Sequence, residues 1–258
     1  MNRLLEYLDF IVHHWHFTKM NLSIIIPVFE ESKKITRDIE AASAFLMSNR
    51  LKGEIIIVDD GSSDNTSQVA EAGEVPAEID LRVLRNDHRG KGFAVRTGIK
   101  MSQGKNVMFA DSGCCVPYDN VLTGLNLIKN GACDIAHGSR KLRESKIYMP
   151  QAWYRRIYST IFRWFIIAIM KIPSEFTDTQ CGFKIYRGDL ARKLYNDCIT
   201  DGFMFDIEII LRARKQKFRI KEFPVEWTAD RDSRLLRNLS LKQMYNELIM
   251  IKRAISKL

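Results

Sequence analysis

The run Ile55–Val58 constrains the fold more than any other stretch, because four branched apolar residues stand in succession and are followed at once by Asp59 and Asp60. A continuous apolar run of this length predicts a strand that is buried on both faces of a parallel sheet. The polar residues 62–64 can cap a helix over 66–71. Ligands of open α/β sheets bind outside the carboxyl ends of the strands, so the two carboxylates lie where a ligand is expected. The alternative is that they are solvated turn carboxylates.

Strands and helices alternate around this run. The further elements that we expect are a strand over 22–26 ended by Pro27, a helix over 33–47, a strand over 81–84, a helix opened by residues 89–92 and continuing to 101, a strand over 106–110 that ends on Asp111, a helix over 121–128 and a strand over 134–136. The alternation predicts an α/β fold with a mostly parallel central sheet flanked by helices. The first strand–helix turn lacks G-x-G-x-x-G, which disfavours a dinucleotide-binding Rossmann domain.

Length, charge and cysteine content narrow the class of protein. The chain has 258 residues, which suits one large domain or one domain with an appended piece. Its net charge of +9 favours an anionic partner, which can be a nucleic acid, an acidic lipid or a phosphorylated substrate. The five cysteines are odd in number and lack the spacing of a zinc site, so we expect reduced thiols in a cytoplasmic protein.

The helix predicted over 153–172 is apolar almost all round and is interrupted by Arg155, Arg156 and Arg163. It is either a buried core helix or an interfacial helix whose basic residues lie on anionic lipid, and the arginines favour the second interpretation. No run reaches the roughly 18 uncharged apolar residues that span a bilayer.

Three parts are expected along the chain. An amphipathic lead-in helix occupies residues 1–20 and has no signal-peptide pattern. The main domain covers residues 21–236 and includes the interfacial region at about 151–173, and an amphipathic helix over 237–258 follows it.

Four motifs occur in a fixed order at the ends of the predicted strands. They are Pro27-x-Phe29-Glu30-Glu31, Val58-Asp59-Asp60-Gly61-Ser62-x-Asp64, Arg89-x-Lys91-Gly92-x-Ala94-Val95-Arg96-x-Gly98 and Phe109-Ala110-Asp111. Together they resemble the nucleotide-sugar domain of family-2 glycosyltransferases, which implies a GT-A fold.

Later motifs narrow the resemblance. They are Gly138-Ser139-Arg140, Thr177-Asp178-Thr179-Gln180-Cys181-Gly182-Phe183-Lys184, Phe205-Asp206-Ile207-Glu208, and Phe223-Pro224-Val225-Glu226-Trp227 before Ser233-Arg234. From about residue 22 to 236 the chain looks like the dolichyl-phosphate β-glucosyltransferases and related polyprenyl-phosphate glycosyltransferases, with 178–184 the most specific part.

The resemblance implies a donor site for a nucleoside diphosphate sugar. Asp60 would accept from the base and Glu31 would hold the nucleoside, which suits carboxylates because they only accept hydrogen bonds. Lys91 and Arg96 would face the diphosphate, although Arg96 is equally well explained as a solvated helix charge. The full donor-binding set is Pro27, Phe29, Glu31, Asp59, Asp60, Lys91, Arg96 and Asp111.

The resemblance also implies an acceptor phosphate and a set of catalytic residues. The acceptor phosphate would bind Arg140, Gln180, Ser233 and Arg234, and the catalytic set would be Asp111, Arg140 and Asp206. Guanidinium groups suit a phosphate because they form paired hydrogen bonds. A phosphate monoester has a second pKa near 6, so at pH 7 it can attack the anomeric carbon without a general base. Attack opposite the leaving diphosphate would invert that carbon.

One position departs from the family pattern. Relatives carry Asp-x-Asp after the fourth strand, where both carboxylates serve a divalent metal, whereas here Gly113 replaces the second Asp. Mg²⁺ often takes only one or two carboxylates together with phosphates and water. We therefore expect Mg²⁺ or Mn²⁺ on Asp111 alone, held more weakly.

The favoured prediction is an inverting enzyme that moves a hexose, with glucose from UDP-glucose preferred, to polyprenyl or dolichyl phosphate at the cytosolic face of a membrane to which it binds peripherally. One alternative is a transferase that uses another donor such as GDP-mannose, or a soluble acceptor. A second is a nucleotide-sugar-binding protein that has lost activity with the second Asp. A nucleic-acid partner is not expected, because no recognised motif accompanies the basic charge.

Overall fold

Strands and helices alternate through the first half of the chain. The structure is a computed structural model and describes residues 20–150, 160, 166–167, 169–170, 172–173, 175–229 and 241–257. Its elements are β1 (Leu22–Val28), α2 (Ile35–Ser48), β2 (Gly53–Asp59), α3 (Thr66–Glu71), β3 (Asp80–Arg85), α4 (Lys91–Met101), β4 (Asn106–Ala110), η1 (Tyr118–Asn120), α5 (Val121–Lys129), β5 (Ile135–Ser139), β6 (Lys146–Met149), β7 (Phe183–Arg187), α7 (Gly188–Asn196), α8 (Phe205–Lys215), β8 (Ile220–Pro224), β9 (Glu226–Thr228) and α9 (Leu241–Ser256).

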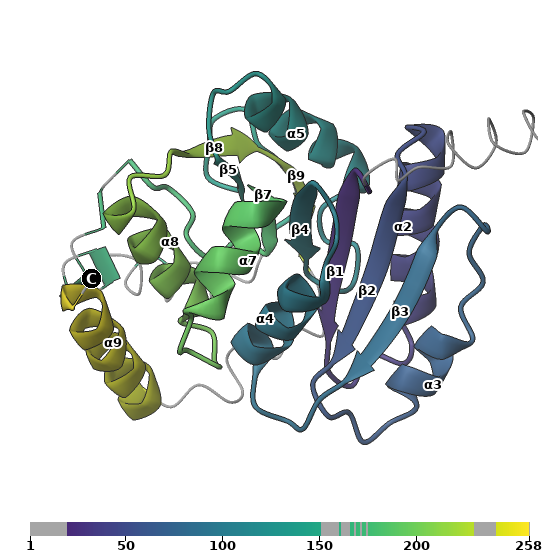
Figure 1. Cartoon of the computed structure of the whole chain (residues 1–258), viewed down its shortest axis with the longest axis horizontal. Coiled ribbons are helices and arrows are strands. Elements are labelled where there is room, and N and C mark those ends of the chain that lie inside the picture. Colours follow the sequence, from purple (N-terminus) through teal and green to yellow (C-terminus); the bar gives the residue numbers. More distant parts are fainter. Residues whose placement is uncertain are drawn as a thin grey trace, which may run out of the picture.

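A seven-stranded sheet forms the centre of the molecule, in the order β3-β2-β1-β4-β7-β5-β8 (Figure 1). β7 runs antiparallel to its neighbours β4 and β5, while the other pairs in this sheet are parallel. The carboxyl ends of all its strands except β7 therefore meet at one edge. β6 and β9 form a separate two-stranded parallel sheet. The predicted α/β fold with a mostly parallel sheet is confirmed.

One local expectation about strands needs correction, and strand β7 was not predicted. The strand expected to end at Pro27 continues to Val28. Pairing of β1 with β4 stops at Ile25, whereas pairing with β2 continues to Val28. Pro27 thus lies where one side of β1 has no strand partner, so its missing N–H interrupts no ladder there. No element was predicted at β7, where Lys184 interrupts the apolar residues; the structure shows that this lysine is buried.

Helices cover both faces of the sheet. On one face of the sheet, α2 and α3 pack on β2, and α5 packs on β5 and β7. On the other face, α4 packs on β1 and β2 against Ile25 and Val58, α7 packs on β4 and β7, and α8 packs on β8. Because successive strand residues point to opposite faces, an uninterrupted apolar run is what such a three-layer arrangement requires.

A third apolar cluster joins α8, α9 and the described part of the segment 151–173. Ile166 and Met170 are 2% and 7% exposed and share this cluster with Ile207 of α8 and Leu248 of α9. For these positions the structure supports the core-helix interpretation rather than the interfacial one. Arg155, Arg156 and Arg163 lie outside the described residues, as does the lead-in helix over 1–20.

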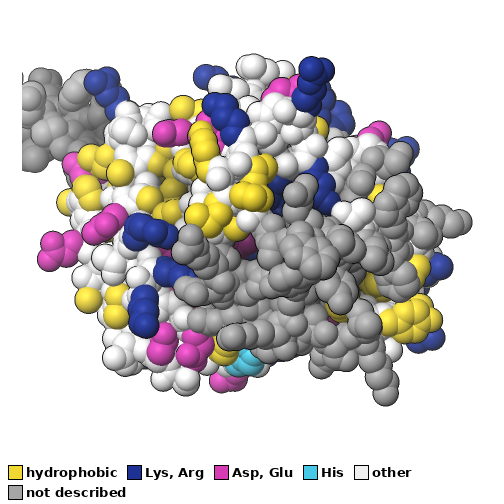
Figure 2. Space-filling view, turned by 180° about the vertical axis from the view of Figure 1, so that it is seen from behind, with side chains coloured by type: hydrophobic (Ala, Val, Ile, Leu, Met, Phe, Trp, Pro, Cys, Tyr) yellow, Lys and Arg dark blue, Asp and Glu magenta, His cyan; other side chains and the backbone are white. Residues whose placement is uncertain are grey.

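Among the helices that the structure describes, none is long and apolar enough to cross a membrane. Figure 2 shows Lys and Arg side chains scattered among acidic and apolar ones over the described part of one face, rather than gathered in a single basic field. All five cysteines are free thiols, in agreement with the prediction from their number and spacing.

Candidate active site

Asp59 closes the turn that follows β2. Its Oδ1 accepts hydrogen bonds from the backbone N–H of Ser62 at 2.9 Å and from the Ser62 hydroxyl at 2.6 Å, and its Oδ2 accepts from the Ser67 hydroxyl. Both oxygens of this buried carboxylate are therefore bound within the turn. This geometry assigns Asp59 to the shape of the loop, and a direct contact with a donor stays a prediction.

Asp60 ties the end of β2 to the start of α4. Its carboxylate accepts from the backbone N–H of Arg89 at 3.1 Å and from that of Gly90 at 2.9 Å. His88 Nδ1 lies 2.8 Å from Asp60 Oδ2, and the His88 ring stacks on Phe29 with 4.3 Å between ring centroids. Asp60 thus borders an aromatic pair that offers a flat surface. His88 was not among the predicted site residues, although it stands directly before the Arg-Gly-Lys-Gly motif.

The Glu30–Glu31 loop after β1 is held against the loop after β2. The backbone N–H of Glu30 donates to the Ser62 hydroxyl at 2.8 Å, and that of Glu31 donates to the Thr66 hydroxyl at 2.8 Å. Glu31 Oε2 lies 3.3 Å from Lys34 Nζ. The first two motifs of the sequence therefore form one continuous rim at the carboxyl edge of the sheet.

Lys91 and Asp111 form an ion pair at this edge, with 2.5 Å between Nζ and Oδ1. Lys91 belongs to the first turn of α4, and Asp111 directly follows β4. A Cβ on Gly182 would overlap the Asp111 carboxylate, so the glycine leaves the space that this side chain occupies. Burial disfavours the Lys91 ammonium, but the carboxylates of Asp111 and Asp206 together raise its pKa above the ordinary value.

A second ion pair, between Lys184 of β7 and Asp206 of α8, is buried beneath the first. Lys184 Nζ also donates to the carbonyl of Thr179 at 3.1 Å. The ammonium groups of Lys91 and Lys184 lie 5.8 and 5.4 Å from the centre of the Phe109 ring, so both pairs share one apolar floor. Burial raises the pKa of the Asp206 carboxyl, and the two ammonium groups offset this only partly. The structure thus brings together Lys91, Asp111 and Asp206, whose roles stay predictions, and adds Lys184.

The loop that carries Gly113 is held by α2. Gly113 has φ +95°, a conformation that favours glycine, and its N–H donates to the Asp38 carboxylate at 2.9 Å. The same carboxylate accepts from the Ser112 hydroxyl at 2.6 Å, and Arg37 Nη2 donates to the Gly113 carbonyl at 2.8 Å. Gly113 therefore serves a backbone turn that an aspartate would strain.

Arg140 follows β5 and is paired with the buried Asp178. Its Nε and Nη2 donate to the two Asp178 oxygens at 2.6 and 2.8 Å, and its guanidinium carbon lies 5.3 Å from the Trp227 ring centre. Burial disfavours both charged groups, but each favours the other, so the pKa of Asp178 falls to about 2 and that of Arg140 rises. Asp111 also contributes to the raised pKa of Arg140. Arg140 and Lys91 thus both lie within electrostatic reach of Asp111.

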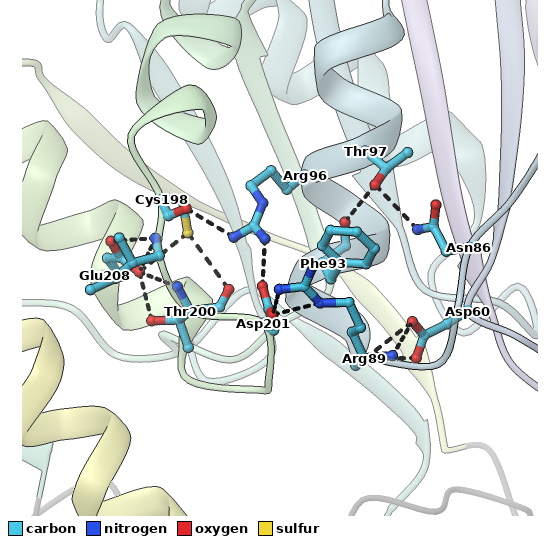
Figure 3. Close-up of polar contacts among 12 residues, drawn as sticks. Asp60, Asn86, Arg89, Phe93, Arg96, Thr97, Cys198, Thr200, Asp201 and Glu208 are labelled. Atoms are coloured by element: carbon cyan, nitrogen blue, oxygen red, sulfur yellow. Dashed lines mark hydrogen bonds and ion pairs between the residues drawn. The ribbon is translucent and has the colours of Figure 1, made fainter.

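Arg96 does not point to the same place as Lys91. Its Nη1 donates to the carbonyl of Cys198 at 2.8 Å and its Nη2 to Asp201 Oδ1 at 2.5 Å (Figure 3). The alternative of a solvated helix charge is therefore wrong, because the Arg96 side chain is only 12% exposed and is bonded to the segment between α7 and α8. A diphosphate contact stays a prediction. Gln180 Nε2 is buried and has no hydrogen-bond partner among the described residues. Ser233 and Arg234 lie outside the described residues.

The arrangement is suited to holding an anion between positive groups. Carboxylates that accept hydrogen bonds border an aromatic pair at one end, Lys91 and Asp111 lie in the middle, and the Arg140 guanidinium lies beyond them. Charge-assisted hydrogen bonds from such groups bind phosphates strongly.

Comparison with known proteins identifies the family. Residues 23–195 match the model of Glycosyl transferase family 2. The chain is 32% identical over 244 residues to a dolichyl-phosphate beta-glucosyltransferase of Drosophila melanogaster, covering 90% of this chain and 74% of the relative. It is 28% identical over 253 residues to the enzyme of the same name from Homo sapiens, covering 92% and 76%.

Two solved structures share the fold. Glucosyl-3-phosphoglycerate synthase from Mycobacterium tuberculosis, in complex with Mn²⁺ and UDP-glucose, matches with a TM-score of 0.64 at 16% identity, over 92% of this chain and 78% of that chain. Residues 1–349 of TarS from S. aureus, in complex with UDP-GlcNAc, match with a TM-score of 0.62 at 19% identity, over 91% and 66%. The predicted GT-A fold is confirmed.

Proposed function

The chain belongs to glycosyl transferase family 2, and we propose that it transfers glucose from UDP-glucose to dolichyl phosphate or a related polyprenyl phosphate, with inversion at the anomeric carbon. The names of its relatives support glucose as the sugar and dolichyl phosphate as the acceptor. UDP-glucose as the donor is supported by the ligand of the mycobacterial enzyme that shares the fold.

The observation that carries this proposal is the position of Asp111 between two cationic groups. Lys91 pairs with Asp111 on the side of Asp60 and the Phe29–His88 stack, and the charge of Asp111 also acts on Arg140. We place the donor diphosphate at Lys91 and the acceptor phosphate at Arg140. The anomeric carbon then lies between them, near Asp111.

The reaction requires the protein mainly to align the two substrates and to stabilise the negative charge of their phosphates. The acceptor phosphate is largely dianionic at pH 7 and attacks without a general base. Lys91 would stabilise the charge that develops on the leaving diphosphate, as positive groups do in phosphate-releasing enzymes. Arg140 would keep Nε and Nη2 on Asp178 and offer Nη1 to the acceptor phosphate. Asp206 would act through Lys184, by holding that ammonium under the site.

A divalent cation fits this site with one carboxylate ligand in place of two. Among the described residues, no group of three or more His, Cys, Asp or Glu is placed to hold a metal. The Asp111 side chain is 40% exposed, however, and one carboxylate with diphosphate oxygens and water is an acceptable set for Mg²⁺ or Mn²⁺. Asp111 would hold the cation, which when bound would neutralise part of the diphosphate charge. The Mn²⁺ in the mycobacterial complex supports this choice of ion class.

We further propose that the protein works as a peripheral enzyme on the cytosolic face of a membrane, because its lipid acceptor would be anchored there. The division into a lead-in helix over 1–20, a catalytic domain over 21–236 and a C-terminal helix over 237–258 belongs to the same proposal.

The test is a screen of UDP-glucose, UDP-GlcNAc and GDP-mannose with polyprenyl phosphate, read by mass spectrometry of the lipid fraction. We expect a hexosyl phospholipid with UDP-glucose, and loss of product on chelation that Mg²⁺ or Mn²⁺ restores. If product forms only with GDP-mannose, GDP-mannose replaces UDP-glucose as the donor in this proposal. Nucleotide binding without product from any donor would favour the alternative of an inactive nucleotide-sugar-binding protein, which the glycine at position 113 motivates.

A further inference from the structure

The segment Cys198–Gly202, between α7 and α8, lies against the start of α4 although about 100 residues separate the two along the chain (Figure 3). No motif marked residues 198–202 in the sequence. Within this segment, Asp201 makes contacts with α4 through both its side chain and its backbone.

The Asp201 carboxylate binds two arginines that flank the first turn of α4. Oδ2 accepts from Arg89 Nε at 3.0 Å and Nη2 at 2.5 Å, and Oδ1 accepts from Arg96 Nη2 at 2.5 Å. Both guanidinium groups also lie over the ring of Phe93, with 4.2 and 5.2 Å from their carbons to its centre. The Asp201 carboxylate therefore joins Arg89 to Arg96, and both arginines contact Phe93.

The backbone of the same segment caps α4. The N–H of Phe93, in the first turn, donates to the Asp201 carbonyl at 3.0 Å. A Cβ on Gly90 would lie 2.7 Å from that carbonyl oxygen, and a Cβ on Gly92 would lie 2.7 Å from the carbonyl oxygen of Gly202. The two glycines around Lys91 therefore make room for this segment.

Glu208 of α8 supports the segment from its other side. Its buried carboxylate accepts from the N–H groups of Ile199 at 3.0 Å and Thr200 at 2.9 Å, and from Arg212 Nε at 2.7 Å. These hydrogen bonds fix the backbone directly before Asp201, so that Asp201 is held in place against α4.

The turn that Asp201 holds is the one that carries Lys91. On one side of it the N–H groups of Arg89 and Gly90 donate to Asp60, and on the other side Asp201 binds Arg89 and Arg96. The contacts with Asp60 and with Asp201 thus clamp the turn from two sides. Lys91 lies between them, and its side chain extends to Asp111. We propose that Asp201 is a positioning residue, which holds the first turn of α4 so that Lys91 meets the donor diphosphate.

This inference rests on the proposed function only in naming the diphosphate as the group that Lys91 meets.

The Asp201→Asn variant keeps the size of the side chain and the backbone cap, but loses the charge that holds two arginines. We expect the KM for the donor to rise and kcat to fall with it, because Lys91 also stabilises the leaving diphosphate. The value of kcat/KM for the donor should drop about 10-fold, equivalent to about 1.4 kcal/mol, while the KM for the acceptor stays within about 2-fold of wild type. Asp201→Glu, which keeps the charge, should recover part of the donor KM.

Asp134→Asn is the matched control. Asp134 also binds two arginines, Arg187 and Arg219, but it lies before β5, at the opposite edge of the sheet from Lys91. It should lose a similar amount of thermal stability while its donor KM stays at the wild-type value. If Asp201→Asn loses stability as the control does and keeps the wild-type donor KM, the positioning role is refuted.

A second readout separates this inference from the proposed function. If wild type forms no product with any donor, the proposed function fails, and hydrogen exchange of residues 89–94 then decides the role of Asp201. Faster exchange at these amides in Asp201→Asn than in Asp134→Asn supports the clamp. Equal exchange in the two variants overturns it.

Discussion

At the scale of single residues, Gly182 decides where the Asp111 carboxylate can lie. A Cβ at position 182 would occupy the place of that carboxylate. Because Asp111 is partly exposed, its side chain can move away without disturbing the core. We expect Gly182→Ala to fold with a free energy of unfolding within about 1 kcal/mol of wild type and to lose roughly 100-fold in turnover, the usual effect of a displacement of about 1 Å at a reacting group.

Gly131→Ala is the control for this substitution. Gly131 has φ +68°, and a methyl group added there would meet no atom of the described residues within 4 Å beyond its chain neighbours. Alanine at this position therefore costs backbone strain of about 1–2 kcal/mol without touching the site. Denaturant unfolding and steady-state kinetics should separate the two variants. Full activity in Gly182→Ala would refute the importance of the Asp111 position.

His137 gives the molecule a dependence on pH. It is fully buried in β5, and neither ring nitrogen has a hydrogen-bond partner among the described residues. Burial, helped by the charge of Lys184, lowers the pKa of this ring well below its ordinary 6.5. The unfolded chain therefore binds a proton below pH 6.5 that the folded chain does not, and stability falls as the pH is lowered from there.

This titration contributes at most about 1.4 kcal/mol per pH unit to the slope of unfolding free energy against pH. We expect His137→Phe to show a shallower slope than wild type between pH 6.5 and 5, measured by urea unfolding. Above pH 7 the two curves should run parallel, which serves as the internal control. Equal slopes in the acid range would mean that another group dominates there.

At the scale of elements, α9 stabilises the half of the molecule that carries Asp206. Leu248 is fully buried in the cluster with Ile207 of α8 and the described residues around Ile166. Leu248→Ala should lower the free energy of unfolding by about 2–5 kcal/mol, because it leaves a cavity between these elements. Met250→Ala, on the exposed side of the same helix, should change it by no more than about 0.5 kcal/mol. Similar losses in the two variants would show that α9 does not pack as described.

At the scale of the whole molecule, the excess of basic residues bears on the proposed binding to a membrane. The exposed side of α9 carries Tyr245 and Met250 together with Lys252, Arg253 and Lys257. Aromatic, apolar and basic side chains on one face suit an interface with anionic lipid. A basic residue near such a surface contributes about 1 kcal/mol, so replacing all three with Gln should weaken binding to anionic liposomes by about two orders of magnitude.

Sedimentation with phosphatidylserine liposomes at low and high salt measures this effect, and wild-type binding should fall as salt rises. Replacing Lys100, Lys105 and Lys129 with Gln removes the same charge from exposed positions elsewhere and should have a smaller effect. Equal effects of the two triple variants would mean that net charge alone drives binding. The parallel test with Arg155, Arg156 and Arg163 addresses the helix first predicted to be interfacial.

Local sequence patterns predicted the layered sheet and the family, and they placed the candidate site at the carboxyl edge of the sheet. A buried parallel strand needs an unbroken apolar run, and the carboxylates after β2 and β4 follow from where those runs end. These are local patterns, with periods of a few residues, so they can be read without knowing the fold. The order of the motifs added the resemblance, and the free cysteines followed from their number and spacing.

Which charges face one another could be seen only in the folded molecule. Asp201 meets Arg96 across 105 positions of sequence, Asp38 meets Ser112 across 74, and Lys184 meets Asp206 from a strand that apolar pattern could not reveal. Each pair joins side chains from segments that are distant along the sequence. Their meeting depends on the packing of whole helices and strands, because a hydrogen bond forms only within about 3 Å and local sequence does not set that distance.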